Sequence, residues 1–150
     1  MKQFKFRLQQ VLEFKRHLEM EQKDQLAVEK IKLDNFLAEE TQLRSKFQFW
    51  AKRYIEFSYK GISPAQAAEI NGFLSELSRM IDQCIKKIQD QEARVETVRQ
   101  QLVEKMKDRK TLESLADKQS SRFLQEEMLK EEKSVEEIIV GRYHQNAPAF

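Results

Sequence analysis

The segment Lys60-Gly61-Ile62-Ser63-Pro64-Ala65-Gln66 separates two long runs of helix-forming residues and decides how the chain folds. Gly61 can take the left-handed conformation that ends a helix. Ser63 can accept hydrogen bonds from the first free N–H groups of a following helix, and Gln66 completes a Ser-x-x-Gln capping box. Pro64 fits the first helical position, where its missing N–H is not needed. Because this connector is only a few residues long, the two helices should fold back antiparallel.

Before the turn, large side chains recur at intervals of three and four residues, which is the spacing of a coiled-coil seam. The seam positions are Leu33, Phe36, Glu40, Leu43, Phe47, Trp50, Tyr54 and Phe57. Continued toward the N-terminus, the same spacing passes through Leu8, Leu12, Lys15, Glu19, Gln22, Leu26 and Glu29. Several of these residues are polar, so we expect looser packing near residues 15–25.

After the turn, a second seam follows the same spacing through Ile70, Leu74, Leu77, Ile81, Cys84, Ile88, Gln91, Val95, Val98 and Leu102. Its register then slips near Met106, resumes through Leu112, Leu115 and Phe123, and shifts again to Leu124, Met128, Glu131, Val135 and Ile138. Gly141 ends the pattern. The sequence therefore predicts an all-α fold, a long antiparallel two-helix coiled-coil hairpin with an overhanging second helix. We expect one domain over residues 1–150, with a helix at 3–60, a turn at 61–63, a helix at 64–140 and a flexible tail at 141–150.

Antiparallel pairing about the turn places Leu8 opposite the region of Ala116, so residues 121–140 have no partner within the chain. This overhang still carries many apolar residues, namely Phe123, Leu124, Met128, Val135, Ile138, Ile139 and Val140. An isolated helix of ~20 residues is marginal in water. Either the overhang frays in the free protein, or another molecule covers its apolar face.

The composition argues against catalysis and against several kinds of ligand. The single cysteine, Cys84, excludes an internal disulfide and a cysteine-based zinc site. His17 and His144 suggest no nucleophile–base arrangement, and three glycines cannot supply a phosphate-binding loop. Paired carboxylates such as Glu131-Glu132 are typical of solvated helix faces. We therefore expect no catalytic residue, no metal site and no cofactor.

Charge and hydropathy limit where the protein is expected to be located and which classes of molecule it is expected to bind. The chain has 27 basic and 25 acidic residues, a net charge of +2, and the signs alternate closely. This pattern favours a solvated helix surface over a nucleic-acid-binding or anionic-membrane-binding one. The N-terminus never reaches an uncharged apolar run, so it predicts neither a signal peptide nor a membrane span. We expect a cytoplasmic protein without direct membrane insertion and without a nucleic-acid partner.

A second apolar stripe lies near the turn, outside both seams. Phe49 lies off the first seam, and Phe73 and Met80 lie off the second. With Leu77 and Cys84, the latter two give a stripe at 73, 77, 80 and 84. A two-stranded coiled coil needs only one stripe per helix. Either bulky residues thicken the hairpin locally, or this flank docks a partner.

The opening segment, Phe4-x-Phe6-Arg7-Leu8-x-x-Val11-Leu12 followed by Arg16 and Glu19, resembles the start of the FliJ family. This family is the small coiled-coil component of the flagellar type III export apparatus. The chain length, the single central turn and the longer second helix are also similar. The resemblance implies a non-enzymatic stalk, similar to the gamma subunit of rotary ATP synthases. Such a stalk inserts into the hexameric export ATPase and promotes its assembly or activity.

The resemblance also implies two contact sites. The end that carries both termini would face the ATPase, and this terminal-end set comprises Phe6, Arg7, Leu8, Val11, Leu12, Arg16, Phe123, Met128 and Ile138. The part toward the turn would face the cytoplasmic domain of an FlhA-like export gate, and this flank set comprises Gln42, Phe49, Phe73, Leu77, Met80 and Cys84. Lys46 and Arg53 depart from the apolar or aromatic residues that the family tends to have there. Export chaperones are further implied partners, and the implied location is the cytoplasmic face of the inner membrane at the flagellar base.

Other interpretations of the same pattern remain open. A generic coiled-coil scaffold would have the same heptads, and so would the related stalk of a virulence type III secretion system. A prefoldin-like chaperone subunit is also a helical hairpin, but its β-hairpin segments would not fit in the short connector at 60–64. The mixed charge disfavours a nucleic-acid-binding helical arm.

Overall fold

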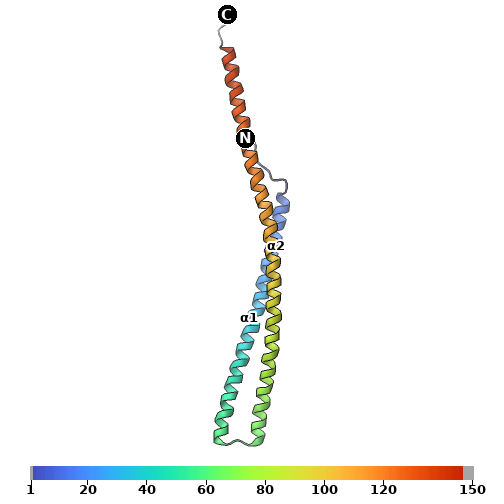
Figure 1. The fold of residues 1–150 in the computed structure, drawn as a ribbon, viewed down its shortest axis with the longest axis vertical. Helices are drawn as coiled ribbons and strands as arrows, with labels where there is room; N and C mark the ends of the chain where they lie inside the picture. The colour runs from blue at the N-terminus through green and yellow to red at the C-terminus, as the bar shows by residue number, and fades with distance from the viewer. Residues whose placement is uncertain (1, 147–150) are drawn as a thin grey trace. The chain divides into compact units, whose positions relative to one another are not determined.

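The computed structural model describes residues 2–146 and places two helices and no strand in that range, α1 (Gln9–Lys60) and α2 (Pro64–Gln145) (Figure 1). The residues fall into two compact units. The turn unit is Met20–Val103, and the terminal unit is Met1–Glu19 together with Glu104–Phe150. Within each unit α1 packs against α2 with opposite chain direction. This confirms the predicted all-α helical hairpin.

The connector between the helices has the predicted capping geometry. Gly61 has a φ of 83°, the left-handed conformation that ends α1. The backbone N–H of Gln66 donates to Ser63 Oγ at 3.2 Å, and the backbone N–H of Ser63 donates to Gln66 Oε1 at 3.4 Å. The capping box is therefore confirmed. It satisfies donors that the first turn of α2 would otherwise leave unpaired.

The turn unit is held together by apolar side chains at the predicted seam positions. One cluster consists of Leu43, Leu77, Ile81, Cys84 and Ile88, with Leu33, Phe36, Phe47, Trp50 and Ile85 packed against it. The other consists of Leu26, Val95 and Val98, with Leu33 and Leu102 packed against it. The ring of Trp50 on α1 contacts the ring of Phe73 on α2. This pairing of residues agrees, to within one helical turn, with the alignment of the two helices that the short connector predicts.

A buried polar pair interrupts this seam. Gln91 Nε2 donates to the backbone oxygen of Glu29 at 2.9 Å and to its carboxylate Oε2 at 2.6 Å. Both residues are buried, and Lys32 Nζ lies 3.6 Å from the other carboxylate oxygen. The hydrogen bond from Gln91 is the main cause that lowers the pKa of Glu29. Because a buried carboxylate without donors is costly, this pair disfavours any shift of one helix along the other.

In the terminal unit, the seam is polar where the sequence suggested loose packing. Glu19 is buried and receives hydrogen bonds from the guanidinium of Arg109. Arg109 also donates to Glu113 at 2.8 Å, and Lys15 Nζ lies 3.6 Å from Asp108. Ion pairs therefore take the place of apolar contacts in this stretch of the seam.

The predicted slip of the second seam near Met106 is wrong. Half-buried residues continue the seam at three- and four-residue spacing through Met106, Arg109, Leu112, Ala116, Ser120 and Phe123. Leu115, which we expected on the seam, is exposed. The physical reason is that Arg109 occupies a seam position that hydropathy alone assigns to the surface, and its charge is neutralised by Glu19.

The first helix begins later than predicted. Residues 2–8 are not helical, and α1 starts at Gln9 instead of residue 3. Along this N-terminal strap (residues 2–8), Phe4, Phe6 and Leu8 are half-buried, whereas Lys5 and Arg7 are exposed. This alternation has the period of two that extended chain shows, not the period of a helix. The ring of Phe4 packs on Phe123 of α2 with centroids 5.6 Å apart.

The second helix also runs past its predicted end. It continues through Gly141 to Gln145, and the backbone N–H of Asn146 still donates to Arg142 O at 3.0 Å. A single glycine inside a helix costs about 1 kcal/mol relative to alanine, which does not by itself stop the helix. The positive charge of Arg142 in the last turn interacts favourably with the helix dipole. Residues 147–150 of the predicted tail lie outside the described residues.

Replacing Gly61 and replacing Gly72 by alanine should change stability in opposite directions. An added Cβ would meet no atom within 4 Å at either position. Gly61→Ala must nevertheless hold a positive φ, so the free energy of unfolding should fall by about 1–2 kcal/mol. Gly72→Ala lies inside α2 and should raise it by about 0.5–1 kcal/mol. Urea unfolding followed by circular dichroism would measure both. Equal effects would contradict the proposed role of the turn.

The contact between Gln91 and Glu29 should make stability depend on acid pH. Since the pKa of Glu29 is lowered in the folded state, its stabilisation is full above the unfolded pKa and is lost as the pH falls through the folded value. The difference in melting temperature between wild type and Gln91→Leu should therefore be larger at about pH 7 than at about pH 3. The same comparison in a Glu29→Gln background is the control, where the difference should not vary with pH. A pH-dependent difference in that background would assign the effect to another group.

Candidate functional site

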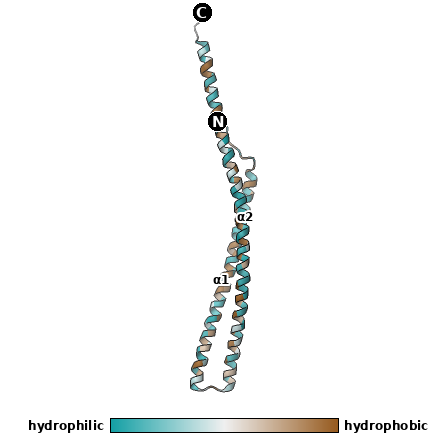
Figure 2. Cartoon of the chain, viewed as in Figure 1, coloured by the Kyte–Doolittle hydropathy of each residue, from teal (hydrophilic) through white to brown (hydrophobic). Residues whose placement is uncertain are grey.

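The terminal unit presents a long apolar surface on α2. Large apolar side chains of the overhang are 51–64% exposed, namely Leu124, Met128, Leu129, Val135, Ile138, Ile139 and Val140. No part of the chain between residues 2 and 146 packs over them. Figure 2 shows that apolar residues continue along this last part of α2. Exposure of this extent on one helix is typical of a surface that another molecule covers.

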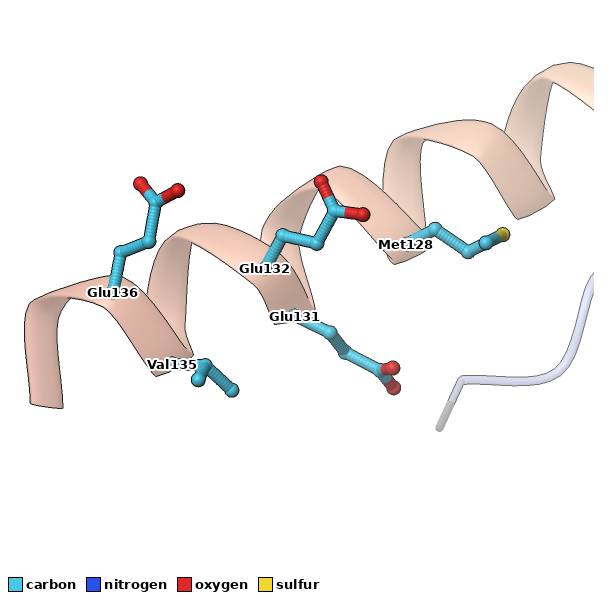
Figure 3. A pocket seen from close by; sticks show the side chains of 5 residues that line it. All are labelled: Met128, Glu131, Glu132, Val135 and Glu136. Carbon is cyan, nitrogen blue, oxygen red and sulfur yellow. The ribbon is translucent and has the colours of Figure 1, made fainter. Parts of the chain in front are cut away.

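Acidic side chains accompany this apolar surface. A shallow hollow on α2 is lined by Met128, Glu131, Glu132, Val135 and Glu136. Figure 3 shows Met128, Glu131 and Val135 projecting from one side of the helix, and Glu132 and Glu136 from the neighbouring side. A docked partner would therefore meet apolar groups and carboxylates together.

The predicted terminal-end set divides into three groups. Leu12 is buried in the seam, so it supports the fold and offers no contact surface. Phe6, Leu8 and Phe123 are half-buried where the N-terminal strap meets α2. The exposed members are Arg7, Val11, Arg16, Met128 and Ile138, of which Arg16 forms an ion pair with Glu113 at 3.2 Å.

Sequence reasoning missed an exposed apolar residue on α1 in the terminal unit. Phe14 is exposed on α1, three residues after the exposed Val11 and four before the half-buried Leu18. These three residues share one face of the helix, immediately beside the seam. The i, i+3, i+7 spacing of apolar residues off the seam was the available signal. Phe14 therefore adds exposed apolar surface on α1 within the terminal unit.

The second candidate surface lies in the turn unit and is built on the only tryptophan. The indole of Trp50 contacts the ring of Phe49 at a centroid distance of 5.5 Å and that of Phe73 at 5.6 Å, both edge to face. Phe49, Phe73 and Met80 are 52%, 44% and 38% exposed. Because Trp50 is a half-buried seam residue, it fixes the two phenylalanine rings from below while leaving them accessible.

Arg53 lies on the same aromatic surface. Its guanidinium carbon is 5.4 Å from the centroid of Phe49 and 5.5 Å from that of Phe57, which is within cation–π range. Arg53 is one of the two positions, with Lys46, where the sequence departs from the apolar or aromatic residues expected on this flank. The structure gives the departure a physical role, because the flat guanidinium covers aromatic surface as a ring would.

Two members of the predicted flank set cannot form its surface. Leu77 and Cys84 are buried in the seam, because the stripe at 73, 77, 80 and 84 crosses from the flank into the core. Burial raises the pKa of the Cys84 thiol, so it is protonated and packs as a small apolar group. Gln42 is exposed on α1. The accessible flank therefore consists of Phe49, Phe73 and Met80, with Gln42 and Arg53 beside them.

Two further features, a metal-binding cluster and a membrane-spanning segment, are not found within residues 2–146. Within residues 2–146 no cluster of three or more histidine, cysteine, aspartate or glutamate residues could hold a metal ion. Neither described helix contains a segment apolar and long enough to cross a membrane.

Comparison with known proteins gave one family. The family model described as the flagellar FliJ protein matches residues 4–148, which is nearly the whole chain. No curated protein and no solved structure matches this sequence.

Proposed function

Since this chain belongs to the family of flagellar FliJ proteins, a non-catalytic component of flagellar protein export, we propose that it is the stalk that connects the export ATPase with the export gate. The terminal unit inserts into the hexameric ATPase ring and promotes its assembly or activity. The flank in the turn unit contacts the cytoplasmic domain of an FlhA-like gate. The site of action is the cytoplasmic face of the inner membrane at the flagellar base, where export chaperones are further partners.

The exposed apolar overhang is the observation that carries this proposal. Its seven apolar side chains lie on a helix that no other described part of the chain covers. Burial of apolar surface contributes about 25 cal/mol per Å². A ring that enclosed this helix would therefore supply the burial that the hairpin itself does not.

The flank near the turn supports the second contact. Phe49, Phe73 and Met80 are exposed, yet Trp50 holds the two rings in defined positions. Rigid, partly exposed aromatic residues lose little conformational entropy on binding, and they are frequent anchors of protein interfaces. An export-gate domain would bury these rings without rearranging the core beneath them.

Polar substitutions on the overhang should weaken the ATPase contact. In the variant Met128→Gln/Ile138→Gln, stimulation of ATP hydrolysis and ring assembly should fall, because apolar area that becomes buried on binding is removed. Both side chains are more than half exposed, so the melting temperature should change little. Steady-state hydrolysis by the purified export ATPase, with and without this protein, measures the effect. The double variant Lys52→Gln/Lys60→Gln, on exposed positions of the turn unit, is a control. Unchanged stimulation by the overhang variant would remove this site from the proposal.

On the flank, stability and function should respond in opposite order. Ile81 is buried, so Ile81→Ala should lower the free energy of unfolding by about 2–5 kcal/mol. Phe73→Ala and Met80→Ala should each cost about 1 kcal/mol, but they should weaken binding to the isolated gate domain by about tenfold or more. Calorimetric titration and thermal melts measure the two quantities. If Phe73→Ala and Met80→Ala melt the hairpin as strongly as Ile81→Ala, or bind normally, the flank is not a docking site.

A further inference from the structure

We propose that the overhang recognises a basic amphipathic helix of its partner and packs against it as one strand of a coiled coil. This inference rests on the proposed function, which assigns the partner at the terminal unit. It adds the chemistry and the secondary structure of the surface that the overhang binds.

The spacing of the exposed residues points to a helical partner. Leu124, Met128, Glu131, Val135 and Ile138 follow one another at intervals of four, three, four and three residues, and all of them are exposed on α2. This is the heptad spacing that places side chains along one seam between packed helices. In the described structure this seam has no second helix beside it, and a helix with such anchors fits a complementary helical surface.

The charges along the seam specify a basic partner. Glu131 lies within the seam and Glu132 lies directly beside it, whereas no lysine or arginine lies on this face between Leu124 and Ile138. At 100° per residue, Lys130 and Lys133 fall on the opposite side of the helix. Figure 3 shows the carboxylate of Glu131 on the same side as Met128 and Val135. Lysine or arginine residues beside an apolar stripe of the partner would pair with these two carboxylates.

Within residues 2–146 the chain offers no equivalent occupant. The N-terminal strap contacts α2 through Phe4 and Phe123, before this seam begins at Leu124. A second copy of the overhang, paired antiparallel so that Leu124 meets Ile138, would bring Glu131 against Glu131 of the other copy. Parallel pairing in register would do the same. Like charges facing each other across a seam oppose association, so the seam disfavours a homodimer and favours a basic partner.

The inference is tested by reversing two charges at the seam of the full-length protein and measuring its binding to the export ATPase. An equal charge reversal on the opposite side of α2 is the control. Glu131→Lys/Glu132→Lys and Glu126→Lys/Glu137→Lys change the net charge equally, but Glu126 and Glu137 are exposed on the side of α2 that faces away from the seam. We expect the seam pair to weaken binding by about tenfold or more, and the control pair by about twofold or less. Raising the salt concentration should weaken binding of the wild type but not of the seam variant. Circular dichroism melts would verify that both variants keep the hairpin.

A photo-crosslinking residue at position 135 identifies what the seam touches. The expected product joins position 135 to an ATPase segment that is helical and carries lysine or arginine beside apolar residues. Crosslinks to a second copy of this chain, or to an acidic or non-helical segment, would overturn the inference. If neither charge variant weakens binding but Met128→Gln/Ile138→Gln does, the overhang is a contact site, and the inference that it binds a basic helix is wrong. If none of these variants weakens binding, the ATPase contact itself is wrong.

Discussion

Two facing helices can bury only one stripe of each other's surface, and this geometric limit governs the structure. The buried seam residues hold α1 and α2 together, whereas large apolar residues such as Phe49, Phe73 and Met80 beside the seams stay exposed to solvent. The hairpin cannot cover Phe49, Phe73 and Met80 without a third element. Nor can α1 cover the last turns of α2, since the chain ahead of α1 has already turned into the strap at residues 2–8. The candidate binding surfaces are thus a direct result of how little a two-helix layer encloses.

Within that limit, the seam is not uniformly apolar. The contacts between Glu29 and Gln91 and between Glu19 and Arg109 place charged or polar groups where leucine would pack well. Such pairs contribute little net stability, because removing charges from water offsets much of what they gain. Our hypothesis is that they fix the register instead, since each acceptor has its donor at only one alignment of the helices. Fixed alignment would matter for the flank, because that candidate binding surface combines residues from both helices.

The sequence predicted the turn and both seams of the turn unit because the signals there are local and repeated. Capping residues act within four positions, and a heptad spacing is averaged over many residues. The start of α1 was misplaced because the strap's alternating pattern is only seven residues long and depends on the distant Phe123. Arg109 was absent from the predicted seam because its position there depends on Glu19, 90 residues away. For the candidate sites, spacing indicated the exposed flank and overhang, but the predicted sets also included Leu77, Cys84 and, through the family resemblance, Leu12, three residues whose burial the seams imply.

The position of the single tryptophan has a practical consequence. Trp50 lies in the turn unit with its indole against Phe49 and Phe73, and the seam encloses its other side only partly. Indole fluorescence shifts to shorter wavelength when water is excluded from the ring. The native protein therefore carries an intrinsic optical probe directly beneath the flank, with no competing indole elsewhere in its sequence. A ligand that covers the flank would change this emission, whereas one bound only at the overhang would leave it unaltered.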